Sequence, residues 1–130
     1  MFHHFLHTYS FRFHYLHAPG YDVFDFIDRA VAEGFTGVAI NANGPNFRHL
    51  SGEDPAHIDR VRRAIDEAGL LVDFETSGTD PTHLARLLEA AKRLGAQHLR
   101  TYTRHAGMTA EKIALTARDL REAARTAEAC

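Results

Sequence analysis

Residues 32–40 read Ala32-Glu33-Gly34-Phe35-Thr36-Gly37-Val38-Ala39-Ile40, and they leave a helix-like segment at Gly34 to enter an apolar run. The same join recurs at Ala68-Gly69-Leu70 and at Leu94-Gly95-Ala96. Glycine is favoured just past the end of a helix because it adopts left-handed backbone angles at little steric cost. The repeated join from helix through glycine to apolar run therefore predicts a chain of successive βα units.

Apolar residues spaced three and four apart predict four helices. The first three lie in 22–34, 54–69 and 80–95, and each ends at one of the three glycines. An aspartate opens each of them, and in the second and third it precedes a proline, which suits the first helical position. The fourth begins near Thr109 and runs to Cys130, with an apolar stripe made of Ile113, Ala117, Leu120, Ala124 and Ala127.

Short apolar runs between these helices predict four strands at 5–10, 36–41, 70–75 and 97–102. Strands that alternate with helices pair in parallel through right-handed crossovers. An open doubly wound sheet is the competing architecture, but the residues after the first strand, Phe11-Arg12-Phe13-His14-Tyr15, contain no glycine-rich phosphate loop. The prediction is a single α/β domain over 1–130, a (βα)4 half of a TIM barrel with parallel strands and outer helices.

Four stretches resemble a known family in order and spacing. They are Thr8-Tyr9-Ser10-Phe11, the stretch 32–40 quoted above, Ala68-Gly69-Leu70-Leu71-Val72, and Ala91-Lys92-Arg93-Leu94-Gly95-Ala96-Gln97-His98-Leu99-Arg100. Together they look like the first four units of xylose-isomerase-like TIM barrels. That superfamily includes sugar phosphate isomerases and epimerases and the endonuclease IV group. The resemblance covers nearly the whole chain and concerns its N-terminal half-barrel fold first.

The resemblance implies a metal-dependent chemistry for which this sequence has only some of the residues. Family members move a proton beside a sugar carbonyl, using a divalent metal held by Glu, Asp, His and Glu at the ends of strands five to eight. The sequence offers no such strands, so we expect no metal ligands and no isomerase activity from this chain alone. The endonuclease group also uses histidines after strands three and four, where this chain has Glu75-Thr76-Ser77 and Tyr102-Thr103-Arg104. Its repair chemistry is therefore disfavoured.

Candidate site residues follow from position, because TIM barrels place their chemistry at the carboxyl ends of the strands. Glu75 is the candidate catalytic base, provided that it is shielded from water. The asparagines suit sugar hydroxyls and the arginines suit a carboxylate or phosphate. The candidate substrate-binding residues are Ser10, Arg12, His14, Asn41, Asn43, Arg100, Tyr102 and Arg104. The alternative is that these are ordinary polar residues of loop ends.

Ten histidines are present, and five of them precede Ala18. On an extended strand His3 and His7 project to the same face, as two metal ligands would. No carboxylate lies at ligand spacing among these histidines and the HExxH pattern is missing, so partly exposed strand and loop histidines are the favoured interpretation. A further hypothesis is that the segment 43–52 after the second strand acts as a lid, because it is long for a connection between a strand and a helix.

The charge and hydropathy of the chain limit which classes of partner can be expected. The net charge is -2 and the charged helix residues mix signs, which disfavours a nucleic-acid partner. No apolar run is long enough to span a membrane and no signal peptide is evident, so we expect a cytoplasmic protein. A small sugar or sugar phosphate is the expected ligand.

Two strand edges and an apolar inner face would remain open in a half barrel, and open edges favour association. We therefore expect a homodimer or other homo-oligomer formed through the exposed strand edges. Two functions stay open: the N-terminal half of a sugar isomerase or epimerase, inactive by itself, or a non-catalytic, self-associating half-barrel scaffold.

Overall fold

The computed structural model describes residues 2–43 and 54–129, and it contains alternating strands and helices. In chain order the elements are β1 (Phe5–His7), the 3-10 helix η1 (Thr8–Phe11), α1 (Arg12–His17), α2 (Val23–Ala32), β2 (Gly37–Asn41), α3 (Pro55–Glu67), β3 (Leu71–Glu75), α4 (Pro81–Leu94), β4 (Leu99–Arg100) and α5 (Thr109–Ala129).

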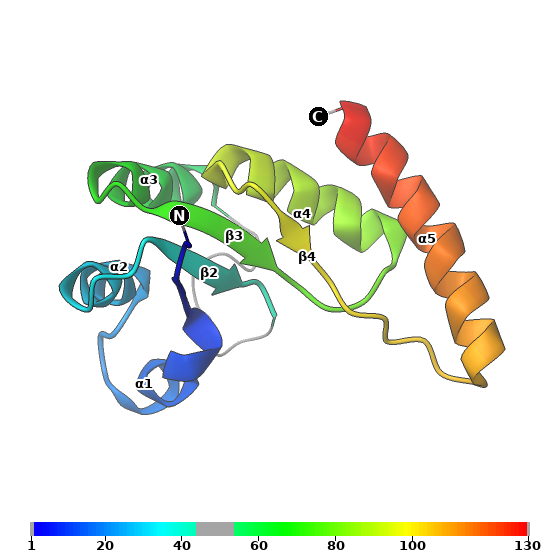
Figure 1. The fold of residues 1–130 in the computed structure, drawn as a ribbon, viewed down its shortest axis with the longest axis horizontal. Helices are drawn as coiled ribbons and strands as arrows, with labels where there is room; N and C mark the ends of the chain where they lie inside the picture. The colour runs from blue at the N-terminus through cyan, green and yellow to red at the C-terminus, as the bar shows by residue number, and fades with distance from the viewer. Residues whose placement is uncertain (1, 44–53, 130) are drawn as a thin grey trace.

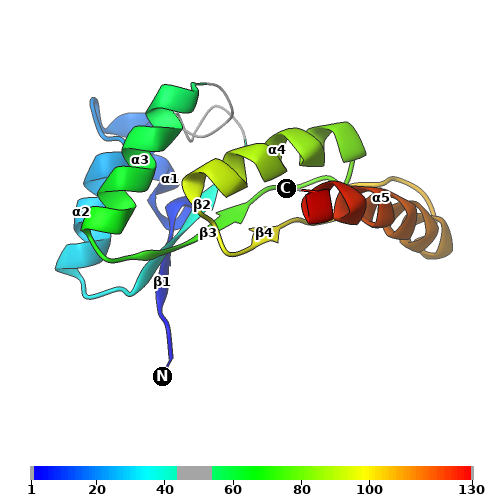
Figure 2. The same cartoon turned by 90° about the horizontal axis from the view of Figure 1, so that it is seen from above.

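All four strands form one parallel sheet in the order β1-β2-β3-β4. Helices α2, α3 and α4 lie on the same face of this sheet, and α5 lies beyond the β4 edge (Figures 1 and 2). A doubly wound sheet would carry helices on both faces. The arrangement therefore confirms the predicted (βα)4 half of a TIM barrel.

The two faces of the sheet differ in chemistry because side chains alternate along each strand. Val38 and Ile40 of β2, with Val72 and Phe74 of β3, are buried against the helices and belong to the main apolar core. The alternate positions face the open side and include charged residues: His7, Asp73, Glu75 and, from β4, Arg100. Phe5, Ala39 and Leu71 share this face with the charged residues. The apolar inner face that the sequence suggested is therefore present only in part, because charged side chains are interspersed in it.

The three glycine joins share one geometry. Gly34, Gly69 and Gly95 have φ angles of 75°, 66° and 76°, in the left-handed region. The residue after each glycine donates its backbone N–H to the carbonyl oxygen five positions earlier: Phe35 to Ala30 at 3.0 Å, Leu70 to Ile65 at 3.1 Å and Ala96 to Ala91 at 2.9 Å. This is the Schellman motif, and it confirms the predicted helix ends.

The N-terminal segment differs from the prediction of a strand over 5–10. The strand ends at His7, whose Nδ1 accepts the Tyr9 N–H at 2.9 Å and so bends the backbone into η1. The Thr8 hydroxyl is buried; it accepts the Asn41 N–H at 2.9 Å and donates to the Ala39 carbonyl oxygen at 3.3 Å. The helix α1 that follows was not predicted at all.

The fourth βα unit is the least regular. Its strand has two residues instead of the six predicted for 97–102, and α5 packs against α4. The buried residues of α5 are Asp119 and Ala123, whereas Ile113 and Leu120 of the predicted stripe are 64% and 42% exposed. The stripe exists, but most of it is left uncovered by the described part of the chain. None of the helices in the described ranges is long and apolar enough to cross a membrane.

Candidate functional site

The carboxyl ends of three strands meet at the side chain of Glu75. Glu75 is the last residue of β3, and its side chain is 6% exposed. One carboxylate oxygen, Oε2, contacts Nε2 of His7 at the end of β1, and the other, Oε1, contacts Nη2 of Arg100 at the end of β4. The condition that Glu75 be shielded from water is met, and the side chain has two partners where the sequence showed none.

The strand between His7 and Glu75 makes their contact possible. In the parallel register His7 aligns with Ala39 of β2, and Asn41 aligns with Glu75. These residues lie on the same face, so the imidazole must pass over β2 to reach the carboxylate. Ala39 presents only a methyl group there, which leaves room for the ring.

Hydrogen bonding assigns the tautomer of His7. Its Nδ1 accepts the Tyr9 N–H at 2.9 Å, so in the neutral ring the proton lies on Nε2. Nε2–H then donates to the Glu75 carboxylate. Because the backbone turn holds Nδ1, the ring orientation is set by the fold and not by a ligand.

Arg100 joins the buried carboxylate to the open side of the sheet. Its side chain is 53% exposed, and its guanidinium lies 5.2 Å from the ring centroid of Tyr102. A guanidinium has five N–H donors in one plane. One nitrogen engages Glu75, and the exposed remainder of the group is suited to oxygen atoms of a ligand.

The two candidate asparagines organise the turn after β2. Asn41 Oδ1 accepts the Asn43 N–H at 2.7 Å. Asn43 Oδ1 accepts the Ser77 N–H at 3.1 Å and the Thr76 hydroxyl at 3.2 Å. Both side-chain oxygens thus stabilise the loops around Glu75. The amide NH2 groups of Asn41 and Asn43 take no part in these bonds, so they are the groups that could donate hydrogen bonds to a ligand.

The other candidates lie elsewhere. His14 of α1 packs at 5.2 Å centroid distance on both Phe11 and Tyr21, and it lines a hollow of about 430 Å³ beside α2. Arg12 lies over the rings of Tyr9 and Phe13. Ser10 and Arg104 are exposed, in η1 and after β4. None of the contacts that the structure gives these four residues reaches Glu75. Apart from Asn43, the predicted lid at 43–52 lies outside the described residues.

The described residues do not fit a divalent metal. Within 2–43 and 54–129 no group of three His, Cys, Asp or Glu side chains is placed to hold an ion. His7 has both ring nitrogens engaged, and Glu75 carries a guanidinium on its second oxygen.

A second polar cluster binds α5 to the strand-end loops. Asp119 of α5 is 1% exposed; its Oδ2 accepts the Thr79 hydroxyl at 3.1 Å and lies 2.8 Å from Nε2 of His105. Arg118 donates to its Oδ1 at 2.7 and 3.0 Å. Hydrogen bonds, first from Arg118 and then from His105 and Thr79, hold the pKa of Asp119 below its usual value despite its burial. The Thr79 hydroxyl that donates to Asp119 also lies 3.0 Å from Nε2 of His105, so the three side chains form one cluster.

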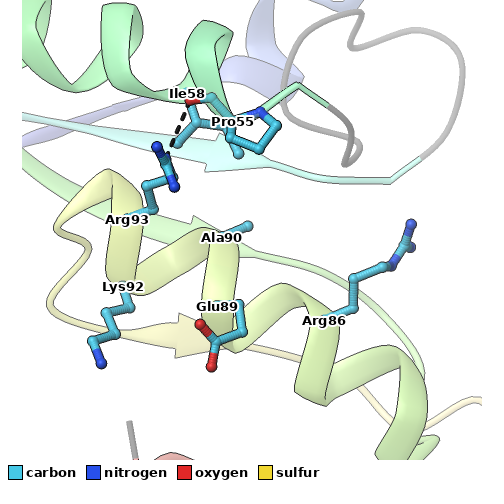
Figure 3. A pocket seen from close by; sticks show the side chains of 7 residues that line it. All are labelled: Pro55, Ile58, Arg86, Glu89, Ala90, Lys92 and Arg93. Carbon is cyan, nitrogen blue, oxygen red and sulfur yellow. Dashed lines mark hydrogen bonds between the residues drawn. The ribbon is translucent and has the colours of Figure 1, made fainter.

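A hollow of about 510 Å³ lies between α3 and α4, in the helix layer (Figure 3). Arg93 crosses it, donating to the Pro55 carbonyl oxygen at 3.2 Å and to both carboxylate oxygens of Asp59 at 2.6 Å. Hydrogen bonding from Arg93 lowers the pKa of Asp59. This hollow is away from the strand ends, and the ion pair beside it joins two helices.

The fold has close structural counterparts. The chain is similar to the D-psicose 3-epimerase of Clostridium cellulolyticum H10 crystallised with D-tagatose, with a TM-score of 0.74 and 15% identity over 99% of this chain and 50% of that chain. A D-psicose 3-epimerase in the presence of D-fructose gives a TM-score of 0.75 and 12% identity over 98% of this chain and 49% of that chain. No protein-family model and no curated protein matches the sequence.

The chain thus spans about half the length of these epimerases. These neighbours are TIM barrels, and the match corresponds to a half barrel. At this identity the likeness shows the fold, and the fold is the one that the four sequence stretches indicated.

Proposed function

We propose that this chain supplies the N-terminal half of a sugar-binding pocket, in a barrel of the isomerase and epimerase type. The observation that carries the proposal is the buried carboxylate of Glu75 at the carboxyl end of β3, held by His7 and Arg100 on the open side of the sheet. TIM-barrel chemistry lies at this end of the strands. The fold likeness to epimerases crystallised with D-tagatose or D-fructose supports a ketose as ligand.

Each group in the cluster has a role in this proposal. Arg100 and the amide groups of Asn41 and Asn43 donate hydrogen bonds to sugar oxygens or to a phosphate. Tyr102, half exposed beside Arg100, offers a ring face to the sugar. Glu75 is the proton acceptor, because it is a carboxylate shielded from water that faces the open side. His7 is a positioning residue that orients Glu75 through its Nε2–H.

The proposal assigns binding, and not turnover, to this chain by itself. The resemblance ties proton transfer beside the carbonyl to a metal held by later strands, and the described residues do not offer a metal site. We therefore expect no conversion of D-fructose to D-psicose by the isolated chain, with or without added divalent cations. Chromatography of the sugars after incubation measures this directly.

Calorimetric titration with D-fructose, D-tagatose and their phosphates tests the binding. Glu75→Gln should abolish or weaken binding at least tenfold, because the amide cannot accept hydrogen bonds on both atoms. The matched control is Glu33→Gln, which alters an exposed carboxylate of α2 that also pairs with an arginine, Arg29. If wild type and Glu75→Gln bind equally, or if neither binds any of these sugars, the proposal fails.

A self-associating scaffold without a ligand is the second candidate function. The uncovered apolar stripe of α5 is the observation that favours it. A stable oligomer that binds none of the sugars would support this second function over the first.

A further inference from the structure

We propose that Asp119 of α5 is a positioning residue of the sugar site, and that it acts by anchoring the segment 101–105, which carries Tyr102. Its carboxylate is buried and acts on the ligand only through this segment, by fixing the backbone that holds Tyr102 beside Arg100. The role of Tyr102 rests on the proposed function, whereas the anchoring can be tested without any sugar.

The pairing between the third and fourth strands continues past the ends of β3 and β4. The N–H of Thr76 donates to the carbonyl oxygen of Arg100 at 2.8 Å. Two residues further on, Gly78 donates in the same way to Tyr102 at 2.7 Å, as in a parallel ladder. The Thr101 hydroxyl also donates to the Gly78 carbonyl oxygen at 2.6 Å. The loop between β3 and α4 thus holds one side of the segment that carries Tyr102.

Helix α5 holds this segment from its other side. Oδ2 of Asp119 accepts the Thr79 hydroxyl at 3.1 Å and lies 2.8 Å from Nε2 of His105. Thr79 directly follows Gly78, and His105 lies three residues after Tyr102. One carboxylate oxygen therefore joins α5 to both of the loops between which Tyr102 is held.

Hydrogen bonds, and not packing, fix the segment. Residues 101–108 lie outside helices and strands, between β4 and α5 (Figure 1), and each of them is exposed or half-buried. The Thr116 hydroxyl of α5 donates to the Thr103 hydroxyl oxygen at 2.8 Å, but this bond is exposed, so water competes for it. Asp119 is 1% exposed and Thr79 2%. Because hydrogen bonds to a buried charge are the stronger kind, Asp119 is the main anchor.

Loss of the carboxylate should therefore reach the sugar site. The buried Thr79 hydroxyl would lose its acceptor and His105 its attachment to α5, and a segment with so little buried surface then becomes mobile. The ring of Tyr102, whose centroid lies 5.2 Å from the Arg100 guanidinium, moves with it. A ligand must then re-order this ring on binding, which lowers the affinity while the Glu75 carboxylate stays in place.

A single tryptophan at position 102 measures the anchoring without a sugar. The sequence contains no tryptophan, so Tyr102→Trp gives one fluorescent reporter on the segment. Adding Asp119→Ala or His105→Ala should lower its fluorescence anisotropy, because the segment gains freedom. His105→Gln should keep the anisotropy of the unaltered anchor, since its amide N–H can donate to Asp119 in place of the imidazole.

The matched control for this reporter is Arg118→Ala. Arg118 pairs with Asp119 at 2.7 Å but belongs to the same helix, so its loss removes a partner of the carboxylate and no bond to the segment. Circular dichroism identifies variants that fail to fold; if Asp119→Ala is one of them, the two His105 variants decide. An unchanged anisotropy in folded His105→Ala, or an equal fall in Arg118→Ala, would overturn the proposal.

Calorimetric titration with D-fructose, in chains that keep Tyr102, tests the link to the sugar site. We expect Asp119→Ala and His105→Ala to bind about three- to tenfold more weakly than wild type. Arg118→Ala and His105→Gln should bind as wild type does. Equal binding by folded His105→Ala would overturn the positioning role even if the anisotropy falls. A wild type that binds no sugar would overturn the proposed function, and the anisotropy would then decide alone whether Asp119 anchors the segment.

Discussion

Ala39 is the residue that allows the candidate site to form. It lies on the same sheet face as His7 and Glu75, on the strand between them, and it is 6% exposed. Any larger side chain at this position would occupy the path of the imidazole. The site therefore depends on a small residue in the middle strand as much as on the charged residues at its ends.

This dependence gives a prediction for Ala39→Leu. The leucine should separate His7 from Glu75 and lower sugar binding as strongly as Glu75→Gln does, while the fold is kept. NMR of the imidazole nitrogens measures the contact, since the Nε2–H signal of His7 should exchange rapidly once its acceptor is gone. Ala39→Ser, which adds one small atom, serves as the control. An unchanged His7 signal in Ala39→Leu would refute the assigned geometry.

Asp119 gives a prediction about pH. Its pKa is lowered in the folded chain, chiefly by Arg118, so its contribution to stability is present above the unfolded aspartate value of about 4 and is lost as pH falls through the folded value. Asp119→Asn should therefore lower the free energy of unfolding at neutral pH, and the gap to wild type should narrow in acid. Urea unfolding at neutral and acid pH measures both. A gap that stays constant down to the acid limit would contradict the prediction.

Position along the strands predicted part of the site, and contacts between distant residues account for the rest. Glu75 and Arg100 were identifiable because each lies in the carboxyl-terminal half of a predicted strand. His7 was missed as the partner of Glu75, since the contact depends on register across β2 and on Ala39. His14 was placed at the strand ends by a strand that proved to stop at His7 and turn into α1. The register of a parallel sheet, which decides which residues of neighbouring strands lie side by side, cannot be predicted from one stretch of sequence.

At the scale of elements, the helices that could be predicted are those whose ends are set by residues close in sequence. Helices α2, α3 and α4 begin at aspartates and end at glycines, and those side-chain and backbone hydrogen bonds lie within a few residues of each end. The orientation of α5 was not predictable from its apolar stripe. Its buried side is fixed by Asp119 and its bonds to Thr79 and His105, which are distant in sequence.

The glycine joins give a prediction at this scale. Gly34 has a φ angle of 75°, and a Cβ added there would meet nothing within 4 Å. Gly34→Ala should thus act through the backbone alone and lower the free energy of unfolding by about 1–2 kcal/mol. Gly34→Asn should cost less, because asparagine tolerates left-handed angles. Equal costs for both variants in urea unfolding would show that the cap geometry is not what Gly34 provides.

At the scale of the molecule, the chain is half of a TIM barrel with one face open. The open face, which was expected to be apolar, carries ion pairs beside its apolar residues, and its strand ends carry the buried carboxylate. The apolar surface that remains uncovered lies on α5, outside the sheet. The polar face thus suits a ligand, and the apolar stripe suits a protein partner.

The central claim is that a sugar binds at the strand ends around Glu75. Titrating the 15N-labelled chain with D-fructose and following every backbone amide in NMR spectra tests it most directly. We predict that shifts converge on Asn41, Glu75, Arg100 and Tyr102 and disappear in Glu75→Gln. Shifts that gather instead at the α3–α4 hollow around Arg86 and Lys92, or that persist unchanged in Glu75→Gln, would contradict the claim.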